Sequence, residues 1–180
     1  MSRPPRVRVG TGYDSHRFDA ARPLILGGVH FPDHPGLSGF SDGDAVAHAV
    51  IDALLGGACL GDIGTHFPPG VERWRGADSM ELLSRVAAML REHSWRAGNL
   101  DVTVICESPR VGPRAEAMRH LLAERAGLAP GAVSVKGKSN EGMGWVGRGE
   151  GIAVQAVALL FHDPGRAAPP AAPVPRKAPG

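Results

Sequence analysis

The sequence has few cysteines and no long apolar run. Cys59 and Cys106 are its only cysteines among 180 residues, which excludes a disulfide framework and a CxxC metal site. No apolar stretch approaches the ~20 residues that a membrane-spanning helix requires. The basic N-terminus, residues 1–8, also lacks the apolar core of a signal peptide. These absences predict a cytoplasmic protein with no membrane partner.

The sequence also lacks a strong excess of charge of either sign. Its formal net charge at pH 7 is +2. The excess lies near the C-terminus, where Arg166, Arg176 and Lys177 accompany a single acid. The remainder is neutral and therefore offers no basic footprint for duplex nucleic acid. We expect no nucleic-acid partner, and an anionic ligand must be held by a few well-placed charges.

Proline and apolar content divide the chain into three parts. Residues 163–180 hold six of the sixteen prolines and almost no large apolar side chains, which predicts a flexible Pro/Ala-rich tail. Residues 1–5 form a short N-terminal extension. Between them, residues 6–162 are long enough to form one domain with its own core.

Within this domain, strand-like and helix-like patterns of apolar residues are mixed. The strand-like segments are 7–9, 24–26, 100–106, 133–135 and 152–160. The helix-like segments are 41–55, 78–93 and 113–127. Residues 60–70 contain too much glycine and proline for a helix and predict a loop. The whole pattern predicts an α+β fold, a single-domain sheet with helices packed on one face.

Two short segments carry residues of the types that bind metal ions. Asp14 and His16 follow a predicted strand. If the chain stays extended there, these two residues point to the same side, with Cα atoms roughly 6.5–7 Å apart. His48 lies on the first predicted helix, in a stripe with Asp44 and Asp52. Taken alone, each pattern also fits an ordinary loop or a solvated helix face. Together they fit a catalytic zinc site of Asp-His-His, with an open fourth position and a neighbouring acid orienting the imidazole.

The segment 136–151, KGKSNEGMGWVGRGEG, combines glycine with charge. Its glycines let backbone amides approach a ligand closely. Lys136, Lys138 and Arg148 supply positive charge, and Glu141 can hold a divalent ion. The segment fits a diphosphate, although a plain turn between two strands has the same composition.

Several longer segments occur in a characteristic order. They are GYDSHRF, SDGDAVAHAVIDALLGGACLGDIG, FP, GADSMELL, GNLDVTVICESPR and NEGMGWVGRGEGIAVQAVALL. In this order they resemble the 2-C-methyl-D-erythritol 2,4-cyclodiphosphate synthases, over roughly residues 6–160. The resemblance implies a phosphorus–oxygen lyase of isoprene (terpenoid) biosynthesis by the non-mevalonate pathway. Such an enzyme converts 4-diphosphocytidyl-2-C-methyl-D-erythritol 2-phosphate to the cyclic diphosphate plus CMP, by metal-assisted attack of the 2-phosphate on the β-phosphorus.

The resemblance also implies a homotrimer whose active sites lie between subunits, and two kinds of metal ion. The zinc ligands fall on Asp14, His16 and His48. The second ion, magnesium or manganese, falls on Glu141.

For catalysis, the resemblance assigns a hydroxyl to Ser139 and expects a histidine at the position of Phe40, which has no side-chain donor. The resemblance also places Ser139, Phe40, Asp14, His16 and Glu141 in contact with the substrate. The resemblance places further contacts near the erythritol and ribose, at the cytidine and near the phosphates. They fall on Ser15, Ser41, Asp62, Ile63, Gly64, Phe67, Pro68, Pro69, Gly70, Val71, Cys106, Glu107, Ser108, Pro109, Arg110, Val111, Gly112, Lys138, Asn140, Trp145 and Arg148.

Two other functions use the same residues. A zinc-dependent hydrolase of nucleotide diphosphates shares the metal ligands but uses water as its nucleophile, and so releases a linear product. A catalytically weak homologue that binds isoprenoid diphosphates or CDP accounts for phenylalanine at position 40. The product formed from the diphosphocytidyl substrate discriminates among the three.

Overall fold

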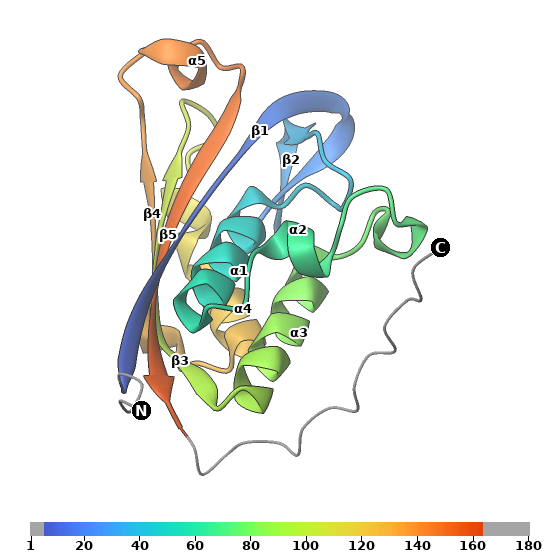
Figure 1. Ribbon diagram of the computed structural model, residues 1–180. Helices are drawn as coiled ribbons and strands as arrows, with labels where there is room; N and C mark the ends of the chain where they lie inside the picture. Colours follow the sequence, from blue (N-terminus) through green and yellow to red (C-terminus); the bar gives the residue numbers. More distant parts are fainter. Residues whose placement is uncertain (1–5, 164–180) are drawn as a thin grey trace.

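One mixed sheet runs through the molecule, with the strand order β2-β1-β5-β3-β4. Its strands are β1 (Val7–Leu26), β2 (Val29–Leu37), β3 (Trp95–Ile105), β4 (Val133–Lys138) and β5 (Gly151–His162). Neighbouring strands are antiparallel except β3 and β4, which are parallel. The computed structural model describes residues 6–163 (Figure 1). The predicted N-terminal extension and all of the predicted tail except Asp163 lie outside the described residues.

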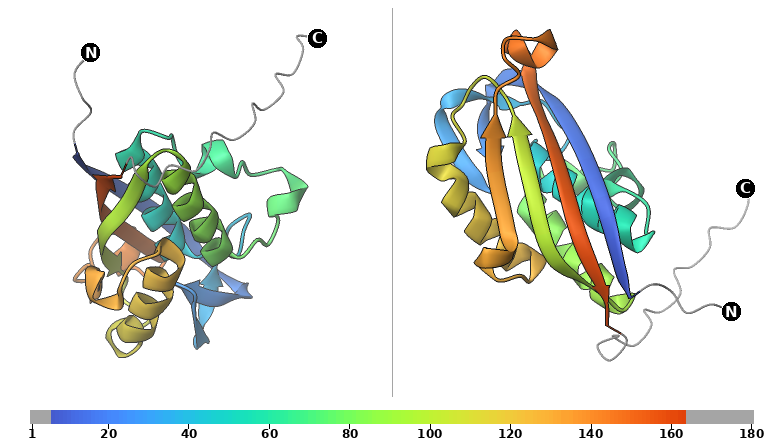
Figure 2. Two further views of the ribbon diagram at one scale, coloured as in Figure 1. Left: turned by 90° about the horizontal axis from the view of Figure 1, so that it is seen from below. Right: turned by 90° about the vertical axis from the view of Figure 1, so that its left-hand side faces the viewer.

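The three long helices cover one face of the sheet, as the fold prediction required. They are α1 (Ala45–Ala58), α3 (Ser79–Glu92) and α4 (Ala115–Ala126). The right-hand view of Figure 2 shows the strands in front and the helices behind them. Among residues 6–163, no helix is long and apolar enough to cross a membrane.

Shorter helical turns connect these elements. They are α2 (Ile63–His66), α5 (Gly144–Gly147) and the 3₁₀ turns Glu72–Trp74, Gly112–Arg114 and Pro130–Ala132. The prediction of a plain loop over residues 60–70 is therefore wrong at α2. Asp62 caps this turn by accepting the Thr65 amide at 2.7 Å, and the Asp52 carboxylate accepts the Ile63 amide at 2.8 Å. Two carboxylates thus hold a helical turn that the local composition disfavours.

The first long helix begins at Ala45, four residues later than predicted. The side chain of Asp44 accepts the amides of Val46 and Ala47, so Asp44 is the N-cap and the preceding residues lie outside the helix. The predicted strand at residues 24–26 is the end of the long strand β1 rather than a strand of its own.

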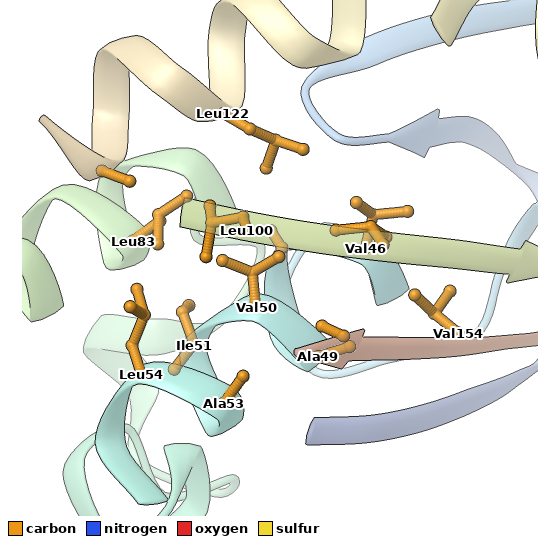
Figure 3. Close-up of a cluster of buried hydrophobic side chains, with 14 of the residues drawn as sticks. Val46, Ala49, Val50, Ile51, Ala53, Leu54, Leu83, Leu100, Leu122 and Val154 are labelled. Carbon is orange, nitrogen blue, oxygen red and sulfur yellow. The ribbon is translucent and has the colours of Figure 1, made fainter. Parts of the chain in front are cut away.

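The core lies between α1 and the sheet and extends to the other two long helices. Figure 3 shows Val50 of α1 close to Leu100 of β3, with Leu83 of α3 and Leu122 of α4 around them. These side chains are fully buried or nearly so. Burial of their apolar surface is the main contribution to stability. α1 is buried on almost every side, so the stripe that contains His48 does not face solvent.

Two glycines let α1 lie directly against β1. A Cβ added at Gly10 would lie 1.9 Å from the carbonyl oxygen of Ala53, and one at Gly12 would lie 2.0 Å from that of Ala49. Both distances are far inside van der Waals contact, so the helix can dock at this distance only on glycine. This contact sets the spacing between the helix and the strand that carry the predicted metal ligands.

The other face of the sheet carries exposed apolar side chains. Val9 and Tyr13 on β1 are 62% and 60% exposed, and Val157 on β5 is 37% exposed. Val157 pairs in register with Thr11, which lies between Val9 and Tyr13 on the strand. The three apolar side chains therefore share one face, and no element of the described chain covers it (Figure 2). We call this the bare face of the sheet.

Candidate active site

The three predicted zinc ligands meet where α1 lies on β1. One carboxylate oxygen of Asp14, Oδ2, lies 2.8 Å from Nε2 of His16 and 3.0 Å from Nδ1 of His48. The two imidazole nitrogens are 3.2 Å apart. Together the three side chains form a group able to hold a metal ion. The structure thus brings together residues that are 32 to 34 positions apart in the sequence.

The donor set suits a tetrahedral metal ion. An ion with bonds of about 2.0–2.1 Å separates two of its tetrahedral ligand atoms by about 3.3 Å. The three donor atoms form a triangle with sides of 2.8, 3.0 and 3.2 Å. They are two imidazole nitrogens and one carboxylate oxygen, the ligands of catalytic zinc sites with an open position.

A backbone carbonyl sets the tautomer of His16. Its Nδ1 lies 2.5 Å from the carbonyl oxygen of Ser38. A carbonyl can only accept, so Nδ1 carries the proton and Nε2 directs its lone pair into the cluster.

Two serines orient His48. Its Nε2 lies 3.0 Å from the hydroxyl oxygen of Ser41 and 3.0 Å from that of Ser79. Ser79 donates its own proton to the carboxylate of Asp42. The Ser79 oxygen is therefore free to accept from Nε2–H, an arrangement in which Nδ1 can bind a metal ion.

The two other acids of the helix stripe bind elsewhere and do not orient His48. Asp44 is fully buried, and its carboxylate accepts the amides of Gly27 and Gly28 at 2.8 and 2.7 Å. Asp52 holds the first residue of α2. Asp42, which lies outside the helix, supplies the negative charge through Ser79.

Charge within the cluster shifts the pKa of two ligands. Burial alone raises the pKa of Asp14, but hydrogen bonds from His16 and His48 outweigh it and hold the pKa well below its ordinary value. Burial alone lowers the pKa of His16, but the hydrogen bond and charge of Asp14 outweigh it and raise the pKa above 6.5. Without a metal, Asp14 thus favours a proton on His16, which a metal ion must displace.

A second predicted group lines a cavity at the ends of β3 and β4. The cavity has a volume of about 500 Å³. Its lining includes Cys106, Glu107, Pro109, Arg110, Val111, Gly112, Lys138 and Ser139. The predicted cytidine segment and the start of the predicted phosphate loop therefore face each other across one hollow. Ser108 lies in an adjoining hollow, 3.3 Å from the His34 imidazole.

Glu107 organises the glycine-rich loop that follows β4. One of its carboxylate oxygens accepts the backbone amides of Asn140 and Gly142 at 2.9 and 3.1 Å. Ser139 donates its hydroxyl proton to Glu141 at 2.8 Å. The sequence predicts that the backbone amides of this loop bind a phosphate. Two of them, those of Asn140 and Gly142, are instead paired with the Glu107 carboxylate.

The remaining predicted contacts come from other elements of the chain. Asp62–Gly64 and Phe67–Val71 belong to α2 and the turn after it, where Phe67 packs edge-on against Trp74 at 5.1 Å between ring centroids. Trp145 belongs to α5, beyond the ends of β4 and β5 (Figure 1), and is followed by Arg148. Ser15 is exposed on the side of β1 opposite to the two ligands that flank it. The predicted site residues thus come from several elements of the chain, and the three metal ligands do not line the cavity at the ends of β3 and β4.

Phe40 lies beside the metal cluster, between Ser38 and Ser41. The guanidinium of Arg75 stacks on its ring, 4.7 Å from the ring centroid. A second arginine, Arg22, donates to the carbonyl oxygens of Gly39 and Ser41 and so holds this backbone in place.

Sequence reasoning missed Arg22, Asp42 and Ser79. Each acts over a long separation in sequence, such as the 37 residues between Asp42 and Ser79. The sequence shows only that Ser79 directly follows the helix cap Asp78, and its burial is evident only in the structure.

Comparison with known proteins matches residues 7–161 to the YgbB family. A 2-C-methyl-D-erythritol 2,4-cyclodiphosphate synthase of Symbiobacterium thermophilum is 53% identical over 152 residues, which cover 84% of this chain and 97% of that protein. A bifunctional enzyme IspD/IspF of an Anaeromyxobacter species is 54% identical over 156 residues, which cover 87% of this chain. They cover only 40% of that longer relative.

Solved structures are similar over the same region. The bifunctional IspDF of Campylobacter jejuni matches with a TM-score of 0.83 and 37% identity, over 87% of this chain and 42% of that one. A 2C-methyl-D-erythritol-2,4-cyclodiphosphate synthase in its CDP-bound form matches with a TM-score of 0.77 and 33% identity, over 85% and 99%. The chain therefore belongs to the YgbB family, together with these cyclodiphosphate synthases.

Proposed function

We propose that this chain is a phosphorus–oxygen lyase that converts 4-diphosphocytidyl-2-C-methyl-D-erythritol 2-phosphate to 2-C-methyl-D-erythritol 2,4-cyclodiphosphate and CMP. The observation that carries the proposal is the convergence of Asp14, His16 and His48, in a chain that matches nearly the whole length of a cyclodiphosphate synthase. The reaction is intramolecular. The 2-phosphate oxygen forms a bond to the β-phosphorus, and the bond from that phosphorus to CMP breaks.

In this reaction the protein has to align and neutralise, and it needs no nucleophile of its own. Asp14, His16 and His48 hold zinc, and Glu141 holds magnesium or manganese. When bound, these ions withdraw charge from phosphate oxygens. Lys138 at the end of β4 and the Ser139 hydroxyl directly after it face the transferred phosphate, where donors that are already oriented lower the barrier most.

The cavity between Cys106–Gly112 and Gly137–Ser139 is the proposed site for the cytidine nucleotide. Its volume of about 500 Å³ is in the range of small-ligand sites. Solved relatives are described as CDP complexes, among them one from Plasmodium falciparum. In this chain the Glu107 carboxylate braces the loop at one side of the cavity.

The active enzyme is proposed to be a cytoplasmic homotrimer with its sites between subunits. Two features support this assembly. The cavity at the ends of β3 and β4 has none of the three metal ligands in its lining, so one chain does not present a continuous site. The bare face of the sheet, with Val9, Tyr13 and Val157 exposed, offers apolar surface to another copy.

Phosphorus NMR of the purified protein with the diphosphocytidyl substrate, zinc and magnesium tests the reaction. Two coupled ring-phosphate signals that grow together with CMP are the expected result. Linear phosphate products would instead identify a hydrolase. An unchanged substrate spectrum, in protein shown to contain zinc, would identify a binding protein and overturn the proposal. Sedimentation equilibrium at several concentrations tests the trimer.

A further inference from the structure

Arg75 is held in place by two neighbouring side chains and by a backbone hydrogen bond of the residue that follows it. Its guanidinium lies 4.7 Å from the centroid of the Phe40 ring, within the range of a cation–π contact. Its Nε donates to the Glu72 carboxylate at 2.8 Å. The next residue, Gly76, donates its amide to the Phe40 carbonyl at 2.8 Å. The side chain and the backbone of this turn are therefore both fixed against Phe40.

Phe40 belongs to the segment that borders the metal cluster. The Ser38 carbonyl accepts from His16, and the Ser41 hydroxyl lies 3.0 Å from His48. A Cβ added at Gly39 would lie 3.5 Å from Cε1 of His16. Phe40 thus belongs to the rim of the cluster, and Arg75 covers its ring.

The terminal amino groups of Arg75 are available for a ligand. In the described part of the chain they have no hydrogen-bond partner, and the side chain is 61% exposed. Arg22, the other arginine at this rim, differs, because both of its terminal nitrogens donate to backbone carbonyls. A guanidinium with two free amino groups presents the fork that binds two oxygens of a phosphate.

We propose that Arg75 contacts a phosphate of the substrate bound at the Asp14–His16–His48 cluster, and that Phe40 is the platform that positions it. This inference rests on the proposed function for the identity of the ligand, a diphosphate ester, while the contact itself is to phosphate oxygens. Glu72 is 78% exposed in its pair with Arg75, so a phosphate displaces it at little cost.

The variant Arg75→Gln tests this contact, and Arg73→Gln is its matched control. Arg73 lies in the same turn, is also exposed, and stacks on Trp74 at 4.5 Å rather than on Phe40. Two quantities are measured with zinc-loaded protein. They are the Kd for inorganic diphosphate, by calorimetry, and kcat/KM for the diphosphocytidyl substrate.

Arg75→Gln is expected to weaken diphosphate binding about tenfold and to lower kcat/KM by at least as much, because a charged hydrogen-bond donor is lost. Arg73→Gln should change both quantities less than twofold. Phe40→Leu, which keeps the position apolar but removes the ring, should shift both in the same direction by a smaller factor. Arg75→Lys should restore part of the loss, a rescue that a purely structural role does not predict.

The outcomes separate this inference from the proposed function. If the wild-type protein forms no cyclic product but loses diphosphate affinity on Arg75→Gln, the phosphate contact stands and the lyase proposal fails. If the wild-type protein forms the product and Arg75→Gln matches it in both Kd and kcat/KM, the inference is overturned. It is also overturned if the wild-type protein binds no diphosphate and turns over no substrate, or if Arg73→Gln has the same effect.

Discussion

Nε2 of His48 and the hydroxyl oxygen of Ser79 lie 3.0 Å apart, in the buried space between α1 and the start of α3. The Ser79 hydroxyl donates a hydrogen bond to the Asp42 carboxylate. The predicted metal ligand His48 is thus oriented by two side chains, Ser79 and Asp42, neither of which belongs to the metal-binding group. Such supporting contacts fix the ring and the tautomer of a ligand.

Removal of this support should weaken metal binding. We expect Ser79→Ala to lower zinc affinity by about 10–100-fold, as for other residues that orient a ligand. Competition with a chromophoric chelator measures the effect. Ser84→Ala is the control, since the Ser84 hydroxyl on the same helix donates only to the Met80 carbonyl. Equal zinc affinities for the two variants would contradict the role of Ser79.

The two cysteines should differ in their reaction with iodoacetamide. Burial, helped by the charge of Glu107, raises the pKa of the Cys106 thiol to about 11, and the thiolate is the reactive form. Cys59 is exposed. We expect alkylation at pH 8 to modify Cys59 alone, as read by mass spectrometry of tryptic peptides. Cys59→Ser should leave a folded protein that takes up no label until it is unfolded. Rapid labelling of folded Cys106 at pH 8 would contradict the burial.

The raised pKa of the Cys106 thiol also affects the stability of the fold at alkaline pH. The folded pKa of Cys106 lies above its ordinary value of 9.0, so between these values the folded chain binds more protons than the unfolded chain. The contribution of the Cys106 thiol to the free energy of unfolding is fully present below pH 9 and is lost as pH rises through about 11. Urea unfolding of the wild type and of Cys106→Ala across this pH range should show that the free energy of unfolding falls more steeply with pH in the wild type.

The close contact of α1 and β1 should not tolerate a methyl group. A Cβ at residue 12 meets the Ala49 carbonyl at 2.0 Å, so Gly12→Ala must push the helix away from the strand. We expect a loss of about 1–3 kcal/mol in the free energy of unfolding, together with weaker zinc binding, because His48 moves with the helix. Gly131→Ala is the control, as nothing lies within 4 Å of its added Cβ. Unchanged stability of Gly12→Ala would contradict the contact.

An imidazole at position 40 should raise activity more when Arg75 is absent than when it is present. Phe40→His supplies a side-chain donor at the rim of the cluster but removes the ring on which Arg75 stacks. In the Arg75→Gln background we expect it to raise kcat/KM, and in the wild-type background we expect a smaller gain or a loss. Steady-state kinetics of the four proteins form a double-mutant cycle. Equal effects in the two backgrounds would show that the two positions act independently.

Residues close together in the sequence were the ones that could be predicted. Asp14 and His16 are two apart on a strand, and their common direction follows from strand geometry. The capping role of Asp78 and the end of α4 at Gly127 also follow from local signals. These contacts do not depend on how the chain folds back on itself.

Features that depend on the tertiary structure were missed. β2 contains Pro32 and Pro35, and these prolines conceal the strand in the sequence. The strand tolerates them because it lies at the edge of the sheet. The support of His48 by Ser79 requires α3 to pack beside α1. The contact of Glu107 with the glycine-rich loop requires β3 and β4 to end side by side.

The metal ligands come from β1 and α1, and the chain between them includes all of β2. In an extended nascent chain, His48 is therefore far from the other two donors. The ion can be captured with three ligands only after the helix has docked on its two glycines, so loading follows folding rather than guiding its first steps. Once bound, the ion joins strand to helix and opposes their separation. We therefore expect metal supply during growth to influence the lifetime of the protein in a cell as well as its activity.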